Sequence, residues 1–278
     1  MNAMTPNIAA GVTVTELAPT TRIALRLAYE GQSFQGWQTQ PGGRAAQDVL
    51  EQALTTVAGH PVATICAGRT DAGVHALAQV VHFDTAARRP ETAWTRGVNA
   101  NLPAGIAVQQ MSLVDHAFHA RFSATQRRYR YLVWRSATRH PLWAGRAAWI
   151  HRPLDVIAMR RAAVHLTGQH DFTAFRSSQC QARSPVRTLS LLELTERDDL
   201  LCVDVQANAF LHHMVRNLVG ALVWVGMGRR PADWAAQVLR SRDRRQAAPT
   251  MPAQGLYLTG VQYGLPHDLG CWPALSVP

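Results

Sequence analysis

The sequence predicts an α+β protein made of two similar units, and three patterns support this prediction. Residues 22–29 alternate between Arg or Ala and large apolar residues, as a strand does, and apolar residues recur at helical spacing over 45–57. The apolar run 76–83 indicates a second long strand, so the chain begins as β-α-β. With 278 residues, 47% of them hydrophobic, the chain can bury one large core or two of ordinary size.

The remaining elements complete one unit and then repeat its plan. Residues 30–44 are rich in Gly and Gln and indicate a long loop that contains Trp37. The first unit continues with a short strand near 62–66, a helix near 92–99 and a strand over 106–113. The second unit has a strand at 128–134, a helix at 154–166, strands between 186 and 206, a long helix at 209–225, a short helix at 232–239 and a strand at 256–262.

These elements define two domains between two tails. We place an N-terminal α+β domain at 21–116 and a C-terminal α+β domain at 117–264. Residues 1–20 and 265–278 contain Pro and lack any hydrophobic period, so both are expected to be flexible tails.

The charge of the chain favours a polyanionic partner. The 28 basic residues exceed the 18 acidic residues, which gives a net charge of +10, and every basic residue is Arg. Because there is no Lys, Schiff-base catalysis, pyridoxal phosphate attachment and a P-loop are excluded. Arg suits phosphate groups and stacked bases, and an excess of positive charge is typical of nucleic-acid binding. A codon bias toward Arg would produce the same composition, and composition does not separate the two explanations.

Cysteine usage and hydropathy indicate a soluble protein of the cytoplasm. Cys66, Cys180, Cys202 and Cys271 lie far apart without a C-x-x-C pair, so we expect reduced thiols rather than disulfides or a zinc knuckle. No apolar run approaches the roughly 20 residues of a membrane span, and the N-terminus lacks a basic region followed by an apolar one. We therefore expect no membrane segment and no export signal.

The first candidate for chemistry is the loop between two apolar strands that contains Arg69 and Asp71. A Gly-bracketed T-D-A-G sequence is often a simple turn in which the Asp bonds its own backbone. Two buried strands would nevertheless hold this loop rigidly, and a nearby guanidinium would keep the carboxylate ionised. Asp71 is therefore a candidate nucleophile or base.

The second candidate is the strand sequence R-R-Y-R-Y at 127–131, in which guanidinium groups alternate with aromatic rings. Tyr129 and Tyr131 share one face of such a strand. Rings and guanidinium groups side by side suit an unstacked base and its phosphates. An ordinary sheet with a solvated basic face and two core tyrosines is the alternative.

The third candidate is the predicted long helix, which contains His212, His213 and Arg216. An apolar stripe buries one side of this helix, so an Arg beside the stripe is costly unless it meets an acid, and Asp71 is the relevant acid. Adjacent His residues point in different directions on a helix, unlike the i, i+4 zinc pair of H-E-x-x-H. We therefore expect the two His residues to have a packing role.

Four motifs in this order resemble the tRNA pseudouridine synthase A (TruA) family. They are G-R-T-D-A-G-V-H at 68–75, R-R-Y-R-Y at 127–131, N-A-F-L-H-H-M-V-R-N at 208–217 and G-L-Y-L at 255–258. The shorter pieces at 36–38, 97–100 and 118–123 agree, and the resemblance extends from Ile23 to Tyr263. It implies two similar ferredoxin-like domains with joined antiparallel sheets and a central basic cleft. It also implies a homodimer that binds tRNA and uses no metal or organic cofactor.

The resemblance also implies an activity and its catalytic residues. The family isomerises uridine to pseudouridine at positions 38, 39 and 40 in the anticodon stem-loop of tRNA. By motif position, Asp71 matches the catalytic aspartate, Tyr129 the tyrosine over the target uracil, and Arg216 the arginine that pairs with the aspartate. A carboxylate can attack C1′ or assist deprotonation, and the sequence leaves both routes open.

The substrate-binding residues follow from the same motifs. Arg69 matches the arginine that helps to displace the flipped base, and Leu256 is expected to form the floor of the pocket. Tyr129, Arg128 and His75 complete the predicted contacts with the substrate. The target base must leave its stack at a cost of a few kcal/mol, which an inserted Arg and a stacking Tyr would offset.

Two other classes of function remain as alternatives. A non-catalytic protein that binds or folds tRNA would use the same basic cleft and stacking residues, but it would not need a carboxylate facing phosphate. A zinc base deaminase also flips bases, but the sequence lacks its H-x-E and P-C-x-x-C ligands.

Overall fold

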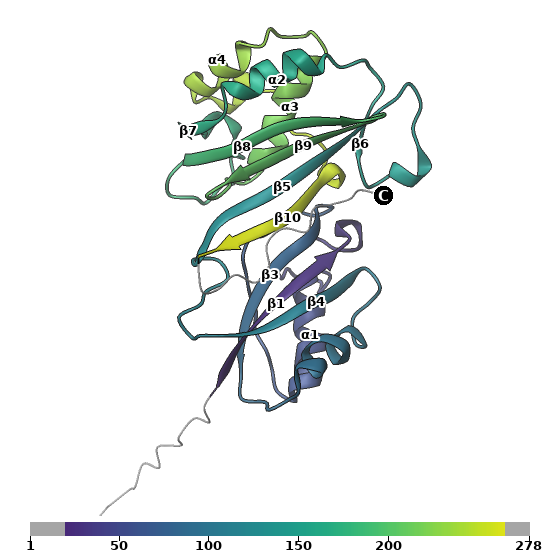
Figure 1. The fold of residues 1–278 in the computed structure, drawn as a ribbon, viewed down its shortest axis with the longest axis vertical. Coiled ribbons are helices and arrows are strands. Elements are labelled where there is room, and N and C mark those ends of the chain that lie inside the picture. Colours follow the sequence, from purple (N-terminus) through teal and green to yellow (C-terminus); the bar gives the residue numbers. More distant parts are fainter. Residues whose placement is uncertain (1–19, 265–278) are drawn as a thin grey trace, which may run out of the picture.

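Residues 20–264 are described by a computed structural model, and they form a mixed α+β structure around one ten-stranded sheet (Figure 1). The order of its strands is β4-β1-β3-β10-β5-β9-β8-β7, with β2 beside β3 and β6 beside β5. Neighbouring strands are antiparallel, except that β10 with β3 and β6 with β5 run parallel. The strands are β1 (Thr21–Tyr29), β2 (Ile65–Cys66), β3 (His75–Thr85), β4 (Ile106–Val114), β5 (Ala124–Arg135), β6 (Ala148–Ile150), β7 (Gly168–Asp171), β8 (Val186–Arg197), β9 (Leu200–Ala207) and β10 (Leu256–Tyr263).

The helices divide between the two ends of the sheet. Figure 1 shows α1 beside the β1, β3 and β4 part, while α2, α3 and α4 gather beside the β8 and β9 part. The helices are α1 (Ala46–Ala58), α2 (Val156–Val164), α3 (Met214–Gly226) and α4 (Trp234–Ser241). No helix among residues 20–264 is long and apolar enough to cross a membrane.

The last strand joins the two parts of the sheet. In β10, Tyr257 and Leu258 pair with His75 and Ala76 of β3, and the other edge of β10 pairs with β5. The C-terminal end of the described chain therefore lies in the middle of the sheet. This topology brings the loop before β3, the start of β10 and the middle of β5 close together, although they are far apart in sequence.

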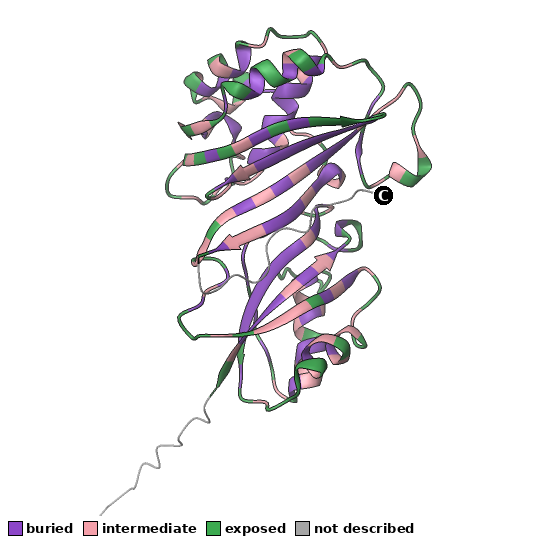
Figure 2. Cartoon of the chain, in the orientation of Figure 1, coloured by how far each residue is buried: buried purple, intermediate pink, exposed green. Residues whose placement is uncertain are grey.

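The core lies between the sheet and its helices, and the central strands are buried (Figure 2). Nearly all of α3 is buried, including the predicted apolar stripe. Gly220 allows this helix to approach the segment before β10, because a Cβ at this position would lie 2.4 Å from the carbonyl oxygen of Pro249. The close contact matters because Arg216, one helical turn earlier, faces the same segment.

Most predicted elements are confirmed, with boundaries within a few residues. The prediction of a helix at 209–225 is wrong at its start, because α3 begins at Met214 and His213 before it adopts a left-handed conformation with φ of 62°. The strand near 62–66 is only two residues long, and the helix near 92–99 contains a π-helical turn at Ala93–Gly97. The predicted tails 1–20 and 265–278 lie outside the described residues, apart from Thr20.

Candidate active site

One cavity of 1060 Å³ contains five of the seven predicted site residues, and loops from both parts of the sheet surround it. Those five are Arg69, Asp71, Tyr129, Arg216 and Leu256. Arg121, Arg127 and Arg187 also line it, so among the described lining residues Asp71 is the single carboxylate beside five guanidinium groups. The cavity therefore suits an anionic ligand.

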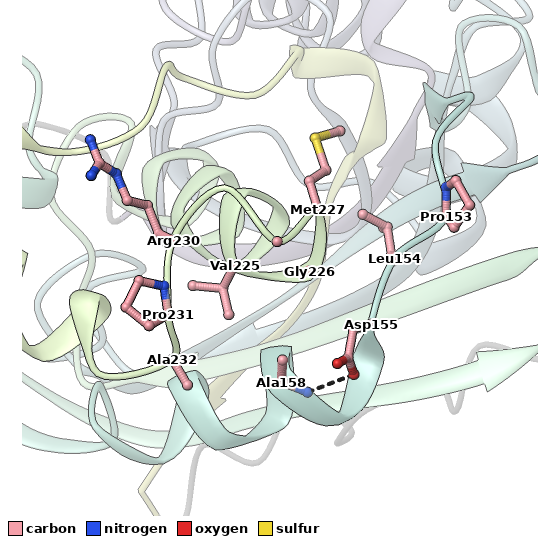
Figure 3. Close-up of a pocket in the computed structure, with 11 residues that line it drawn as sticks. Pro153, Leu154, Asp155, Ala158, Val225, Gly226, Met227, Arg230, Pro231 and Ala232 are labelled. Carbon is pink, nitrogen blue, oxygen red and sulfur yellow. Dashed lines mark hydrogen bonds between the residues drawn. The ribbon is translucent and has the colours of Figure 1, made fainter.

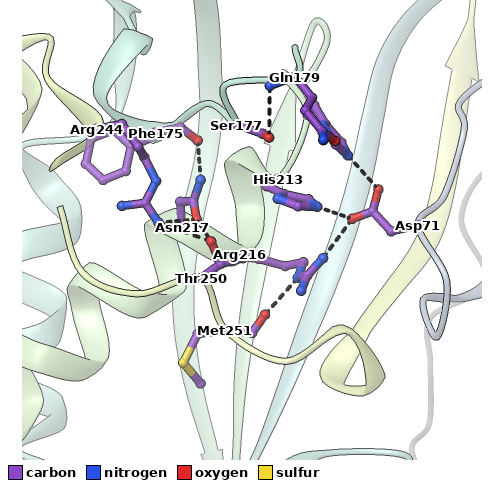
Figure 4. A network of polar contacts seen from close by, with 11 residues as sticks. Asp71, Phe175, Ser177, Gln179, His213, Arg216, Asn217, Arg244, Thr250 and Met251 are labelled. Carbon is purple, nitrogen blue, oxygen red and sulfur yellow. Dashed lines mark hydrogen bonds and ion pairs between the residues drawn. The ribbon is translucent and has the colours of Figure 1, made fainter.

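Asp71 lies at the centre of a polar cluster in this cavity. Nη1 of Arg216 donates to Oδ2 of Asp71 at 2.8 Å. This contact was predicted because an Arg beside a buried stripe needs an acid. Nε2 of His212 lies 3.2 Å from Oδ1, and Nε2 of His213 lies 3.2 Å from Oδ2. Figure 4 shows His213 and Arg216 pointing at the carboxylate. The side chain of Asp71 remains 27% exposed, so a substrate can still reach it.

The two His residues were assigned a packing role, and the structure corrects this prediction. Both precede α3 rather than lying on it, and the positive φ of His213 turns its ring toward Asp71, with the ring centroids of His212 and His213 4.0 Å apart. Burial lowers the pKa of His213, and the negative charge of Asp71 opposes that shift. Neutral His213 therefore leaves the carboxylate with Arg216 as its permanent positive partner.

Hydrogen bonds from buried residues hold the loop that carries Asp71. The hydroxyl groups of Tyr29 and Thr70 lie 2.7 Å apart, and the amide of Gln79 donates to the Gly68 carbonyl at 2.6 Å. The backbone N–H of Trp37 donates to the Thr70 carbonyl at 2.9 Å. Because Gln79 and Trp37 are almost wholly buried, these contacts fix the part of the loop that leads into Asp71.

A second network fixes Arg216. Its Nε donates to the Met251 carbonyl at 2.7 Å, so the guanidinium is held at both ends (Figure 4). The neighbouring Asn217 is fully buried and anchors the same segment, since its Oδ1 accepts from Thr250 at 2.7 Å and from Arg244 at 3.1 Å. Its Nδ2 donates to the Phe175 carbonyl at 2.8 Å. The network therefore positions Arg216 through the 250–251 segment.

Tyr129 and Leu256 form an apolar wall of the cavity. Both are buried, and the ring of Phe210 packs edge-on against Tyr129, with centroids 5.0 Å apart. Burial raises the pKa of Tyr129 above its usual value, so its hydroxyl stays protonated at neutral pH. The ring is consequently suited to stacking on a base, while the phenol is poorly suited to accept a proton.

Arg127, for which the sequence motifs predicted no role, connects β5 to three segments around the cavity. Its guanidinium donates to the carbonyls of Ala67, Arg121, Ala124 and Asn208 at 2.6 to 3.1 Å. The period of two along β5 could have predicted that Arg127 lies at the cavity, because Arg127 must share a face with Tyr129. This buried Arg links the Asp71 loop to the loop before β5 and to the end of β9.

Two predicted substrate-binding residues lie away from the cavity. Arg128 lies on the opposite face of β5, where Nη2 is 3.4 Å from the carboxylate of Asp204. His75 is buried in the join between the sheet halves, where Nδ1 accepts from the Gly31 N–H, Nε2 lies 3.0 Å from the Gly145 carbonyl and the ring stacks on Tyr257. Burial lowers the pKa of His75, in agreement with a neutral ring in a structural position.

The cluster at Asp71 also has the composition of a metal-binding site. One oxygen of Asp71 and one nitrogen each of His212 and His213 all lie within 4.8 Å of one another. Two imidazoles and a carboxylate are a common set of ligands for transition metals. Arg216 already contacts the same carboxylate, so a cation would have to compete with its positive charge.

A second hollow, of 760 Å³, lies where α2 and the end of α3 approach one another (Figure 3). Its walls are largely apolar, with Leu154, Val225 and Pro231 among them. Its carboxylate, Asp155, accepts the N–H of Ala158 at 2.9 Å and caps α2. That acid is therefore used structurally, and the hollow offers no comparable chemistry.

Comparisons with known proteins identify the family. A family model described as tRNA pseudouridine synthase matches residues 27–123 and 162–264. The tRNA pseudouridine synthase A of Bordetella petrii is 59% identical over 244 residues, which cover 87% of this chain and 91% of that protein. The protein of that name from Thiobacillus denitrificans is 52% identical over 256 residues, covering 91% and 98%.

Among solved structures, the crystal structure of a Cbf5-Nop10-Gar1 complex covers 85% of this chain and 48% of its own. Its identity of 11% and TM-score of 0.37 are too low to support an inference. The curated relatives cover most of the chain, and the family model includes every residue of the cluster at Asp71. The chain therefore belongs to the tRNA pseudouridine synthase family.

Proposed function

We propose that this protein isomerises uridine to pseudouridine at positions 38, 39 and 40 in the anticodon stem-loop of tRNA, with Asp71 as the catalytic carboxylate. The observation that carries this proposal is the ion pair of Asp71 with Arg216, in a cavity that also contains Tyr129 and Leu256. The curated relatives, all named as synthases, do not support the non-catalytic alternative.

The chemistry agrees with these groups. Isomerisation breaks the bond from C1′ to N1 and joins C5 to C1′, while the proton leaves C5 and N1 gains one. Because no atom is added or removed, the reaction needs no cofactor. Arg216 holds the carboxylate of Asp71 through the contact at 2.8 Å, and this carboxylate would attack C1′ or assist deprotonation of the sugar. Tyr129 would stack on the released uracil and Leu256 would support it.

The positive lining of the cavity explains how the target base could be reached. Arg69 is exposed and, among the described residues, has no ion-pair partner, so its guanidinium is available to displace the uridine from its stack. Arg121 is exposed in the same cavity and would contact a phosphate, whereas the guanidinium groups of Arg127 and Arg216 are already bonded within the protein. For Arg128 and His75, substrate binding stays a prediction that their positions do not support.

We further infer the organisation of the active protein. Residues 21–116 and 117–264 would form two ferredoxin-like domains, joined through β3 and β10, with the basic cleft between them. We expect a homodimer in the cytoplasm, with one tRNA held across both subunits. This arrangement rests on the resemblance to the family together with the position of β10 between the two parts of the sheet.

The test is conversion of uridine to pseudouridine in an unmodified tRNA transcript, mapped by position. Wild-type protein is compared with Asp71→Asn, and tRNA binding is measured for both. Asp204→Asn is the matched control, because that carboxylate pairs with Arg130 at 2.8 Å on the other face of β5. We expect product at positions 38 to 40 with wild type and with the control.

Loss of product with Asp71→Asn, while tRNA binding persists, would establish the catalytic role of this residue. Product at other positions would refute the proposed site selection. Folded wild-type protein that binds tRNA but makes no pseudouridine would refute the enzymatic proposal and favour a binding protein.

A further inference from the structure

The loop between β4 and β5 exposes an aromatic ring that the proposed mechanism does not use. Phe122 is 77% exposed, the largest exposed fraction among the large hydrophobic residues of the described chain. One neighbour of its ring is His119, whose imidazole stacks on it with centroids 4.3 Å apart. The guanidinium carbon of Arg121 lies 5.6 Å from the centre of the same ring. We call these three residues the Phe122 platform.

Local hydrogen bonds fix the platform in one orientation. Nδ1 of His119 accepts the backbone N–H groups of Arg121 at 3.2 Å and Phe122 at 3.1 Å. The hydroxyl of Ser123 accepts the N–H of His119 at 2.9 Å, and the N–H of Ser123 donates back to the His119 carbonyl at 2.9 Å. Burial lowers the pKa of His119, so its ring is neutral at pH 7 and Nδ1 remains an acceptor. An exposed ring held this rigidly loses little entropy when it binds.

The platform is continuous with the cavity around Asp71. Arg121 lines that cavity, and its carbonyl accepts from the buried guanidinium of Arg127 at 2.6 Å. The same guanidinium nitrogen donates to the Ala67 carbonyl at 3.1 Å, four residues before Asp71. The exposed ring is therefore joined rigidly to the loop that carries the catalytic carboxylate.

We propose that the Phe122 platform binds an unpaired base of the tRNA that lies beside the target uridine. Phe122 would stack on that base, and Arg121 would contact the phosphate between the base and the flipped nucleotide. Aromatic rings beside guanidinium groups are typical stacking sites for single-stranded nucleic acid. The positive charge of the adjoining cavity favours RNA over a second copy of this basic chain. This inference rests on the proposed function, because it assumes that the substrate is tRNA.

The test compares Phe122→Ala and Phe122→Tyr with wild type in equilibrium binding of a tRNA transcript. We expect Phe122→Ala to raise Kd about 10-fold, since stacking on one base typically supplies an effect of this size, and Phe122→Tyr to stay near wild type. Leu142→Ala is the matched control, because Leu142 is 73% exposed but does not line the cavity. It should leave Kd unchanged.

A fluorescent base analogue shows whether stacking occurs. 2-Aminopurine is placed on one side of the target uridine in one transcript and on the other side in a second transcript. Wild type and Phe122→Tyr should quench the fluorescence of one of these transcripts, and Phe122→Ala should quench neither. Sedimentation of each variant shows whether the ring serves a dimer contact instead. The proposal would be overturned if Phe122→Ala bound tRNA with the wild-type Kd and still quenched the 2-aminopurine fluorescence. It would also be overturned if Phe122→Ala changed the oligomeric state of the protein without changing Kd. Because binding and quenching need no turnover, a wild type that makes no pseudouridine would refute the proposed function separately.

Discussion

Asn217 provides the sharpest test of how the fold positions Arg216 against the carboxylate of Asp71. Its fully buried amide joins α3 to the Phe175 carbonyl, to Thr250 and to Arg244. Substituting Ala removes all of these hydrogen bonds at once. The Phe175 carbonyl would lose the donor that Asn217 provides, whereas Thr250 and Arg244 would still have each other, with Oγ1 and Nη2 3.1 Å apart.

The magnitude follows from these partners. A buried polar group left without a partner costs about 1–3 kcal/mol, and weakening the other two contacts adds about 1 kcal/mol, so we expect about 3 kcal/mol for Asn217→Ala. With an unfolding entropy of about 2.1 cal/mol/K per residue, this lowers Tm by about 5 °C. Asn101→Ala is the matched control, because that exposed amide makes one hydrogen bond, to the Gly97 carbonyl at 2.9 Å.

Thermal melts measure the effect of Asn217→Ala on the stability of the fold, and pseudouridine formation at 25 °C measures its effect on the position of Arg216. If Asn217 holds the segment that contacts Arg216, the folded variant should also lose about 10-fold in kcat/KM, which corresponds to one hydrogen bond. A Tm within 1 °C of wild type would refute the energetic reasoning. A lowered Tm with unchanged kcat/KM would show that the network stabilises the fold without positioning Arg216.

Three further predictions follow from other parts of the structure. Gly220→Ala should lower Tm by several degrees and reduce activity, because its Cβ would lie 2.4 Å from the Pro249 carbonyl oxygen. Gly264→Ala is the control and should do neither, because a Cβ there meets nothing within 4 Å. Equal Tm values for the two variants would contradict this prediction. Burial lowers the pKa of His82 from 6.5 to about 4, so as the pH falls the imidazole is protonated in the unfolded chain before it is protonated in the folded one. The free energy of unfolding should therefore decrease between pH 6.5 and pH 4. Urea unfolding midpoints measure that loss, which should be smaller in His82→Gln; an equal loss in the variant would exclude His82 as its source. The affinity for tRNA should fall linearly with salt on logarithmic axes because of the net charge of +10, and a flat titration would contradict the expected phosphate contacts.

The sequence by itself determined the local structure and five of the residues that line the cavity around Asp71. Periods of two and of 3.6 report which face of a segment is buried, and that information is local. The contact between Asp71 and Arg216, 145 residues apart, could also be predicted, because an Arg beside a buried stripe needs an acid. The order of the four motifs pointed to the family, which the comparisons then showed.

The period of a β-strand predicts which side chains of the R-R-Y-R-Y motif share a face. Along β5, the period of two places Arg128 on the face opposite Tyr129, so the two cannot line one cavity. The structure places Arg128 beside Asp204, whereas Arg127, on the Tyr129 face, connects the loops around Asp71.

Only the tertiary structure decided the position of the residues that no period describes. His212 and His213 reach Asp71 because the chain turns through a positive φ before α3 begins, a conformation that costs a non-Gly residue free energy and that no hydrophobic pattern indicates. His75 joins the two parts of the sheet because β10 pairs with β3, a strand about 180 residues earlier in the chain. Such contacts depend on the register of distant strands, and a register is set by the packing of the whole sheet rather than by any one segment.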